Sequence, residues 1–102
     1  MNKVALVTGG SRGIGLGIAK HLAVSGFDLA INGIRPIKKV RDVLDELHSI
    51  GIDVIYCTGD ICNQKHRESI VNKVKDHFGH LNVLVNNAGA ARAASLTPPD
   101  PY

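Results

Sequence analysis

The stretch that decides the fold is Val4-Ala5-Leu6-Val7-Thr8-Gly9-Gly10-Ser11-Arg12-Gly13-Ile14-Gly15. Its apolar run, Val4–Val7, predicts a strand buried on both faces, as a parallel sheet requires. The glycines after it let the backbone turn sharply and approach a ligand without a Cβ in the way. A helix follows, and its free N–H groups and positive dipole end favour a phosphate. The stretch therefore predicts a phosphate-binding turn; glycines that only close a tight strand–helix connection are the alternative.

Three further short apolar runs predict strands farther along the chain, over Leu29–Ile31, Val54–Cys57 and Leu81–Val85. Runs of helical period separate the four strands. Strict alternation of strand and helix implies right-handed crossovers. The sequence thus predicts an α/β fold, in which a parallel sheet carries helices on both faces.

Capping signals mark the ends of the predicted helices. The first helix carries one apolar stripe, formed by Ile14, Ile18, Leu22 and Ala23, and Gly26 suits its left-handed end. A second helix is predicted over 37–50, after Pro36 and before Gly51. Asn63 is expected to cap a third, which ends at Gly79.

Length and composition exclude several classes of protein. The 102 residues make one domain at most, and 44% apolar with 21% charged residues is typical of a globular protein. No apolar run approaches the roughly 20 residues that cross a bilayer. Two cysteines are too few for a disulfide scaffold, which favours a cytoplasmic protein.

A net charge of +3 and four aromatic residues do not indicate nucleic-acid binding. His77 and His80 lack further metal ligands, so we predict no metal site.

The spacing of the glycines separates the known phosphate-binding motifs. A P-loop needs Lys where Leu16 follows Gly15, and Gly-x-Gly-x-x-Gly fails because Ile18 holds the third position. Gly9, Gly13 and Gly15 instead fit Gly-x-x-x-Gly-x-Gly. This pattern resembles the cofactor turn of the short-chain dehydrogenase/reductase family.

Two more motifs strengthen that resemblance. Asn86-Asn87-Ala88-Gly89 resembles the family's Asn-Asn-Ala-Gly, and Asp60-Ile61 resembles the pair that contacts adenine there. Together the motifs cover nearly all of residues 3–89. The resemblance implies a Rossmann-like sheet of strand order 3-2-1-4, incomplete in this chain, with the cofactor at the carboxyl ends of the first and fourth strands. It also implies that Thr8 tethers the loops after these two strands.

The implied cofactor is a nicotinamide dinucleotide. The stretch 31–35 has no acid to bind the ribose hydroxyls of NAD, whereas Arg35 and Arg12 can converge on a 2′-phosphate. We therefore predict NADP(H), with NAD(H) as the alternative. A solvated side chain is the other interpretation of Arg12, and a helix-entry charge that of Arg35. The predicted cofactor-binding residues are Gly9, Ser11, Arg12, Gly13, Ile14, Gly15, Asn32, Arg35, Asp60, Ile61, Asn86, Ala88 and Gly89.

The catalytic part of the family pattern is missing. Tyr56 is followed four residues later by Asp60, and Tyr102 is the last residue, so no Tyr-x-x-x-Lys occurs and no catalytic residue is assigned. We expect residues 1–90 to be the nucleotide-binding half of the domain, and the Ala/Pro-rich residues 91–102 to begin the loop toward the substrate region. The resemblance implies a homo-oligomeric reductase of carbonyls or secondary alcohols, with 3-oxoacyl thioesters the leading substrate. We expect the chain alone to be inactive. A non-catalytic nucleotide-binding module, complete at 102 residues, is the alternative.

Overall fold

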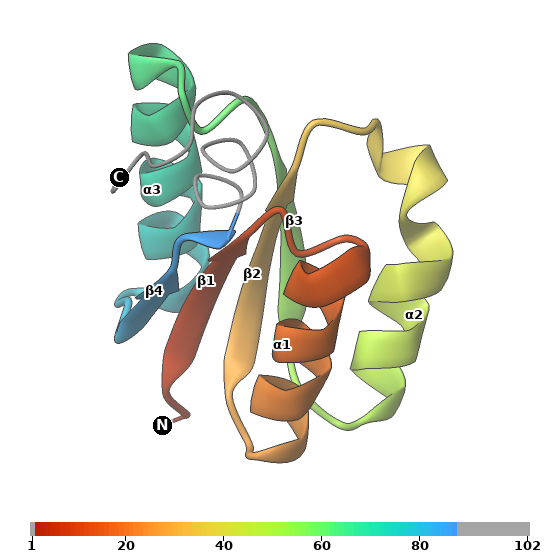
Figure 1. Cartoon of the computed structure of the whole chain (residues 1–102). Helices are drawn as coiled ribbons and strands as arrows, with labels where there is room; N and C mark the ends of the chain where they lie inside the picture. Colours follow the sequence, from red (N-terminus) through yellow and green to blue (C-terminus); the bar gives the residue numbers. More distant parts are fainter. Residues whose placement is uncertain (1, 88–102) are drawn as a thin grey trace, which may run out of the picture.

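The computed structural model describes residues 2–87, which alternate strand and helix (Figure 1). In chain order the elements are β1 (Val4–Thr8), α1 (Gly13–Val24), β2 (Asp28–Gly33), the 3-10 turn η1 (Ile37–Lys39), α2 (Arg41–Ser49), β3 (Val54–Thr58), α3 (Gln64–Phe78) and β4 (Val83–Val85). The strands are parallel and lie in the order β3-β2-β1-β4. The predicted fold class and strand order are confirmed.

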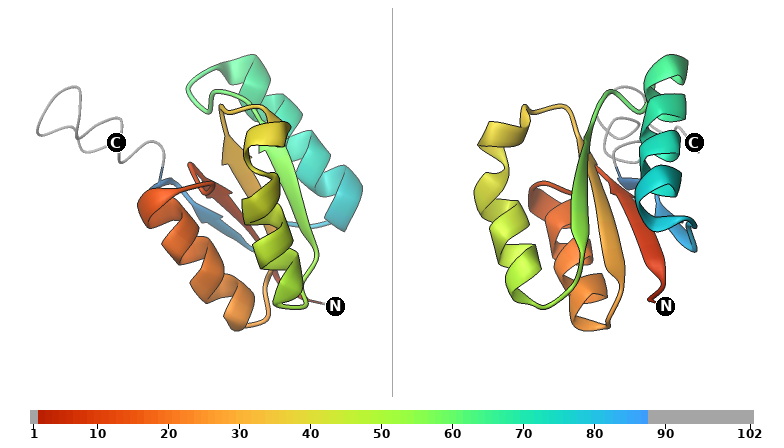
Figure 2. Two further views of the ribbon diagram at one scale, coloured as in Figure 1. Left: turned by 90° about the vertical axis from the view of Figure 1, so that its right-hand side faces the viewer. Right: turned by 180° about the vertical axis from the view of Figure 1, so that it is seen from behind.

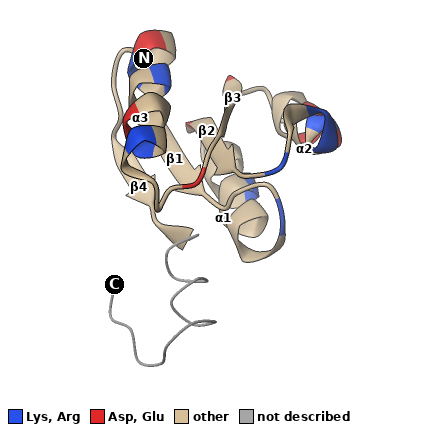
Figure 3. Cartoon of the chain, turned by 90° about the horizontal axis from the view of Figure 1, so that it is seen from above, with Lys and Arg blue, Asp and Glu red and all other residues tan. Residues whose placement is uncertain are grey.

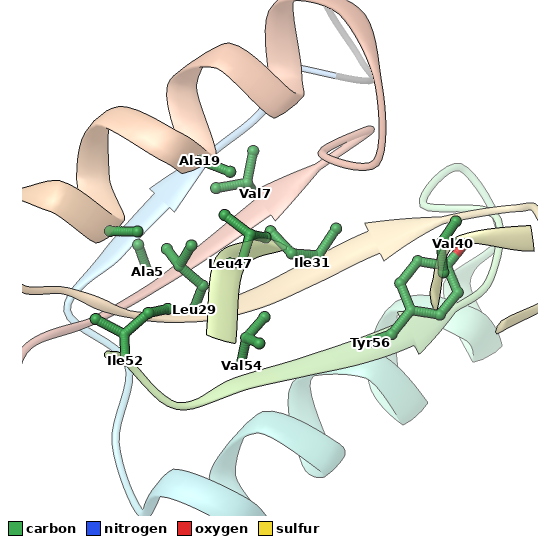
Figure 4. Close-up of a cluster of buried hydrophobic side chains, with 11 residues drawn as sticks. Ala5, Val7, Ala19, Leu29, Ile31, Val40, Leu47, Ile52, Val54 and Tyr56 are labelled. Carbon is green, nitrogen blue, oxygen red and sulfur yellow. The ribbon is translucent and has the colours of Figure 1, made fainter. Parts of the chain in front are cut away.

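Helices cover both faces of the sheet, α1 and α2 one face and α3 the other (Figure 2). The larger apolar cluster packs β1, β2 and β3 against α1 and α2, and includes Val7, Leu29, Ile31 and Leu47 (Figure 4). A smaller cluster under α3 joins Leu6 to Ile70 and Val74. Val4–Val7 is buried along its whole length, as expected for a strand between two helical layers.

The register of the strands brings their carboxyl ends to one edge of the sheet. Thr8 of β1 lies opposite Asn32 of β2, which lies opposite Cys57 of β3. On the other side of β1, Val7 lies opposite Val85. The loops after all the strands therefore meet at this edge, which is uppermost in Figure 1.

The prediction of one continuous helix over 37–50 is wrong, because the structure divides this segment in two. Its first turn is the 3-10 turn η1, and α2 begins only at Arg41. Between them Val40 leaves helical geometry, with φ −118° and ψ 8°. Val40 is fully buried in the larger cluster, so the break accompanies the packing of this side chain into the core.

Two smaller expectations also need correction. The fourth strand spans Val83–Val85 instead of beginning at Leu81. Before it, Asn82 bonds to Val4 of β1 twice: its N–H donates to the Val4 carbonyl at 2.9 Å, and its Oδ1 accepts the Val4 N–H at 2.8 Å. In the predicted stripe of α1, Ala23 is buried and Leu22 packs half-buried against the core, but Ile14 is 78% exposed; Gly15 and Ala19 are the other buried residues of the helix.

The predicted caps are confirmed. Asn63 Oδ1 accepts the N–H of His66 at 3.1 Å at the start of α3, and Gly79 ends that helix with φ +84°. Gly26 is left-handed after α1. Within residues 2–87, no helix combines the length and the apolar character that crossing a membrane requires.

Candidate functional site

The glycine turn connects β1 to α1 at the carboxyl edge of the sheet. Gly9 and Gly13 have φ of +63° and +60°, a region that L side chains rarely adopt. A Cβ on Gly15 would lie 2.1 Å from the carbonyl oxygen of Gly9, so α1 packs directly against the turn. The N–H of Gly10 donates to the carbonyl of Asn32 at 3.0 Å, which joins the turn to β2. Each of the three motif glycines thus has a steric reason.

The first turn of α1 is left open to an anion. Arg12 is the N-cap residue, and no side chain of residues 2–87 caps the helix. The first N–H groups of a helix have no intrahelical partner, and they attract phosphate together with the helix dipole. Within residues 2–87, and apart from its chain neighbours and the backbone of α1 itself, no atom lies within 4 Å of the place where a Cβ on Gly13 would stand. The turn therefore fits the diphosphate of a dinucleotide.

Arg35, just past β2, lies against the glycine turn. Its Nη2 donates to the carbonyl oxygen of Ser11 at 3.0 Å and to its hydroxyl at 3.1 Å. The hydroxyl of Tyr56 in β3 donates to the carbonyl of Arg35 at 2.7 Å. The Nε of Arg35 is buried without a hydrogen-bond partner in the part of the chain described. Arg12 is exposed. Figure 3 shows Lys and Arg on the loops at this edge.

The position of Tyr56 changes the pKa of its phenol. Burial raises the pKa of Tyr56, and the nearby Arg35 guanidinium opposes that rise. Sequence reasoning did not assign Tyr56 to the site. The available signal was a buried strand position, where a tyrosine hydroxyl needs a partner.

The ends of β1 and β4 are joined by polar side chains. The hydroxyl of Thr8 donates to the carbonyl of Val85 at 3.2 Å and to Oδ1 of Asn86 at 3.5 Å. Asn87 Nδ2 donates to the carbonyl of Gly9 at 3.3 Å. Thr8 thus has the tethering contact expected of it, and Asn87 joins the glycine turn to the end of β4. Ala88 and Gly89, and the tail 91–102, lie outside the described residues.

The loop 59–62 carries the predicted adenine contacts, Asp60 and Ile61, beyond the end of β3. Asn32 supports it from β2: the side-chain amide donates to the carbonyls of Cys57 and Gly59 at 2.9 and 3.0 Å. Asn32 is only 2% exposed. Its observed contacts therefore hold this loop, and direct contact between Asn32 and a cofactor stays a prediction.

A surface hollow of about 750 Å³ lies elsewhere, along β3 and the outer face of α3. Ile55, Lys65, Lys73 and His77 are among its lining residues, and none of the predicted cofactor-binding residues lines it. Lys73 Nζ donates to the carbonyl of Tyr56 at 2.7 Å there. This contact joins α3 to β3, the outer strand of the described sheet.

Comparison with known proteins identifies the family. The model of the short chain dehydrogenase family matches residues 3–99. The chain belongs to the short chain dehydrogenase family. It is 41% identical over 94 residues to the hydroxynaphthalene reductase arp2 of Aspergillus fumigatus. The aligned residues cover 92% of this chain and 34% of that protein.

Solved structures of family members share the fold. A 3-oxoacyl-[acyl-carrier protein] reductase of Brucella melitensis in complex with NAD is 46% identical, with a TM-score of 0.79 over 85% of this chain and 33% of that chain. The L-sorbose reductase of Gluconobacter frateurii, complexed with NADPH and L-sorbose, is 32% identical, with a TM-score of 0.80 over 86% and 34%. This short-chain dehydrogenase chain spans about a third of the length of these relatives.

Proposed function

We propose that this chain is the cofactor-binding part of an NADP(H)-dependent reductase that acts on a carbonyl or a secondary alcohol. The observation that carries the proposal is the contact of Arg35 with Ser11, just past the end of β2, where residues 31–35 include no acidic residue. An acid at that position would repel a 2′-phosphate, whereas a guanidinium attracts one.

Each segment of the edge has a part in holding the dinucleotide. The diphosphate rests on the open first turn of α1, over Gly13, Ile14 and Gly15. Arg12 and Arg35 contact the 2′-phosphate, and Asp60 and Ile61 contact the adenine. Asn86, with Ala88 and Gly89, lies at the nicotinamide ribose. Support comes from the uncapped helix and from the left-handed glycines of the turn.

The bound nicotinamide supplies hydride exchange with the substrate carbonyl carbon. The leading substrate class is a 3-oxoacyl thioester; the Brucella reductase is named for such a substrate and the Gluconobacter enzyme for a sugar. Residues 1–102 contain no Tyr-x-x-x-Lys. The chain's own residues therefore bind and orient the cofactor, and we expect no NADPH turnover from it alone. For the whole protein we propose a cytoplasmic homo-oligomer.

Parallel titrations of NADPH and NADH test the cofactor assignment. Arg12→Ala is the informative variant, because Arg12 is exposed and its side chain makes no hydrogen bond with residues 2–87. Loss of one charge-assisted contact should weaken NADPH about tenfold and leave NADH unchanged. Arg41→Ala, an exposed cation on α2, is the matched control. Tighter binding of NADH than of NADPH by the unmodified chain would contradict the proposal.

A further inference from the structure

The loop 59–62 is held from two sides. From β2, the carbonyl of Gly33 accepts the N–H of Gly59 at 2.9 Å, beside the contacts of Asn32. From α3, Nδ1 of His66 accepts the N–H of Asp60 at 2.9 Å. Arg67 Nη1 donates to the carbonyl of Ile61 at 2.9 Å. The N–H of Asp60 and the carbonyl of Ile61 thus bond to side chains in the first turn of α3.

His66 is placed for this contact by the start of its own helix. Its N–H donates to Oδ1 of the N-cap residue Asn63, and its side chain reaches back to the chain before the helix. The arrangement resembles a capping box, in which the third helical residue accepts an N–H from the cap. Here the accepted N–H belongs to Asp60, three residues before the cap. The imidazole therefore couples the helix start to the loop.

We propose that His66 is a positioning residue for the adenine end of the cofactor site. The inference rests on the proposed function, because it takes Asp60 and Ile61 to face the adenine. The Asp60 carboxylate already accepts the N–H of Cys62 at 2.9 Å, so the turn bends back on itself. By accepting the N–H of Asp60 itself, His66 restricts the backbone that presents the carboxylate. This role requires a lone pair on Nδ1, with the imidazole proton on Nε2.

ADP is the probe, because it carries the adenine without the nicotinamide or the 2′-phosphate. His66→Ala removes the acceptor and should weaken ADP about fivefold, the effect of one ordinary hydrogen bond. His66→Asn offers an amide oxygen close to the place of Nδ1 and should restore the affinity. His48→Ala is the control, since His48 is an exposed histidine of α2 without a side-chain hydrogen bond among residues 2–87. Circular dichroism melts confirm that each variant folds.

Nitrogen NMR of the unmodified chain tests, without any variant, which ring nitrogen of His66 carries the proton. The Nδ1 of His66 should show the shift of an unprotonated imidazole nitrogen, and the Asp60 amide should exchange slowly with solvent. The proposal is overturned if Nδ1 carries the proton, if His66→Ala binds ADP like the unmodified chain, or if folded His66→Asn does not recover affinity. Failure of the unmodified chain to bind either ADP or NADPH contradicts the proposed function itself, and the inference with it.

Discussion

Arg35 contacts Ser11 twice through a single nitrogen, since Nη2 donates to the carbonyl oxygen at 3.0 Å and to the hydroxyl at 3.1 Å. The two residues belong to different loops, one after β2 and one after β1. The contact therefore ties the glycine turn to the cation that we assign to the 2′-phosphate. It joins two residues that are 24 positions apart in sequence.

Arg35→Met separates the electrostatic part of this contact from packing. Methionine keeps an unbranched apolar stem and removes the charge, the two bonds to Ser11 and the unpaired Nε. We expect NADPH affinity to fall about tenfold or more and NADH affinity to change little. The free energy of unfolding should change by less than about 1 kcal/mol, because removal of a buried unpaired group offsets the lost bonds.

Fluorescence titration and urea unfolding of Arg35→Met measure these two quantities. Lys38→Met, which removes an exposed cation from η1, is the control. Equal losses of NADPH and NADH affinity would show that Arg35 shapes the turn and does not read the phosphate.

Tyr56→Phe tests the buried phenol. At neutral pH it removes the bond to the Arg35 carbonyl, which should cost about 1 kcal/mol. The raised pKa means that the folded chain holds the phenol proton more tightly than the unfolded chain does. This contribution to stability is therefore complete below the unfolded value and is lost as pH rises through the folded one.

Urea unfolding at pH 8 and above pH 10 measures how the contribution of Tyr56 to the free energy of unfolding changes with pH. The stability of the unmodified chain should fall more steeply with pH than that of Tyr56→Phe, so the difference between them should narrow. A difference that widens at alkaline pH would be inconsistent with a raised pKa.

Gly15 and Gly17 form a matched pair within α1. A Cβ on Gly15 would meet the backbone of Gly9 at 2.1 Å, whereas one on Gly17 would meet nothing within 4 Å outside its own helix in the described part of the chain. Gly15→Ala should therefore destabilise the fold by about 1–3 kcal/mol through overpacking. Gly17→Ala should stabilise it by roughly 0.5–1 kcal/mol, because alanine is the better helix former. Thermal unfolding of the two variants measures both effects, and equal shifts would contradict the packing of α1 against the turn.

The two cysteines should differ in reactivity. Burial raises the pKa of Cys57, and the side chain is 1% exposed, while Cys62 is exposed in the loop after β3. Since the thiolate is the reactive form, a thiol reagent at pH 8 should modify Cys62 first. Mass spectrometry of partly labelled chain identifies the site, and Cys62→Ser should abolish the fast phase. Fast labelling of Cys57 in folded Cys62→Ser would show that β3 is less protected than the structure indicates.

The parallel α/β class could be predicted from the alternation of apolar runs and helical periods. The family resemblance carried by the three motifs then implied the strand order and the edge that carries the candidate site. Side-chain networks could not be predicted in this way. The bonds of Arg35 to Ser11 and of Asp60 to His66 depend on rotamers and loop paths that local patterns do not specify. The break at Val40 arose where tertiary burial overrode helical period. Ile14 is exposed because the face of α1 that carries Gly15, Ala19 and Ala23 lies against the sheet and the glycine turn.

The most direct test of the account maps the backbone amides that move when NADPH is added to the labelled chain. We predict that the largest chemical-shift changes fall on residues 9–15, 32–35 and 59–62. Changes concentrated along the hollow lined by Lys65, Lys73 and His77, with residues 9–15 unaffected, would contradict a dinucleotide site at the first turn of α1.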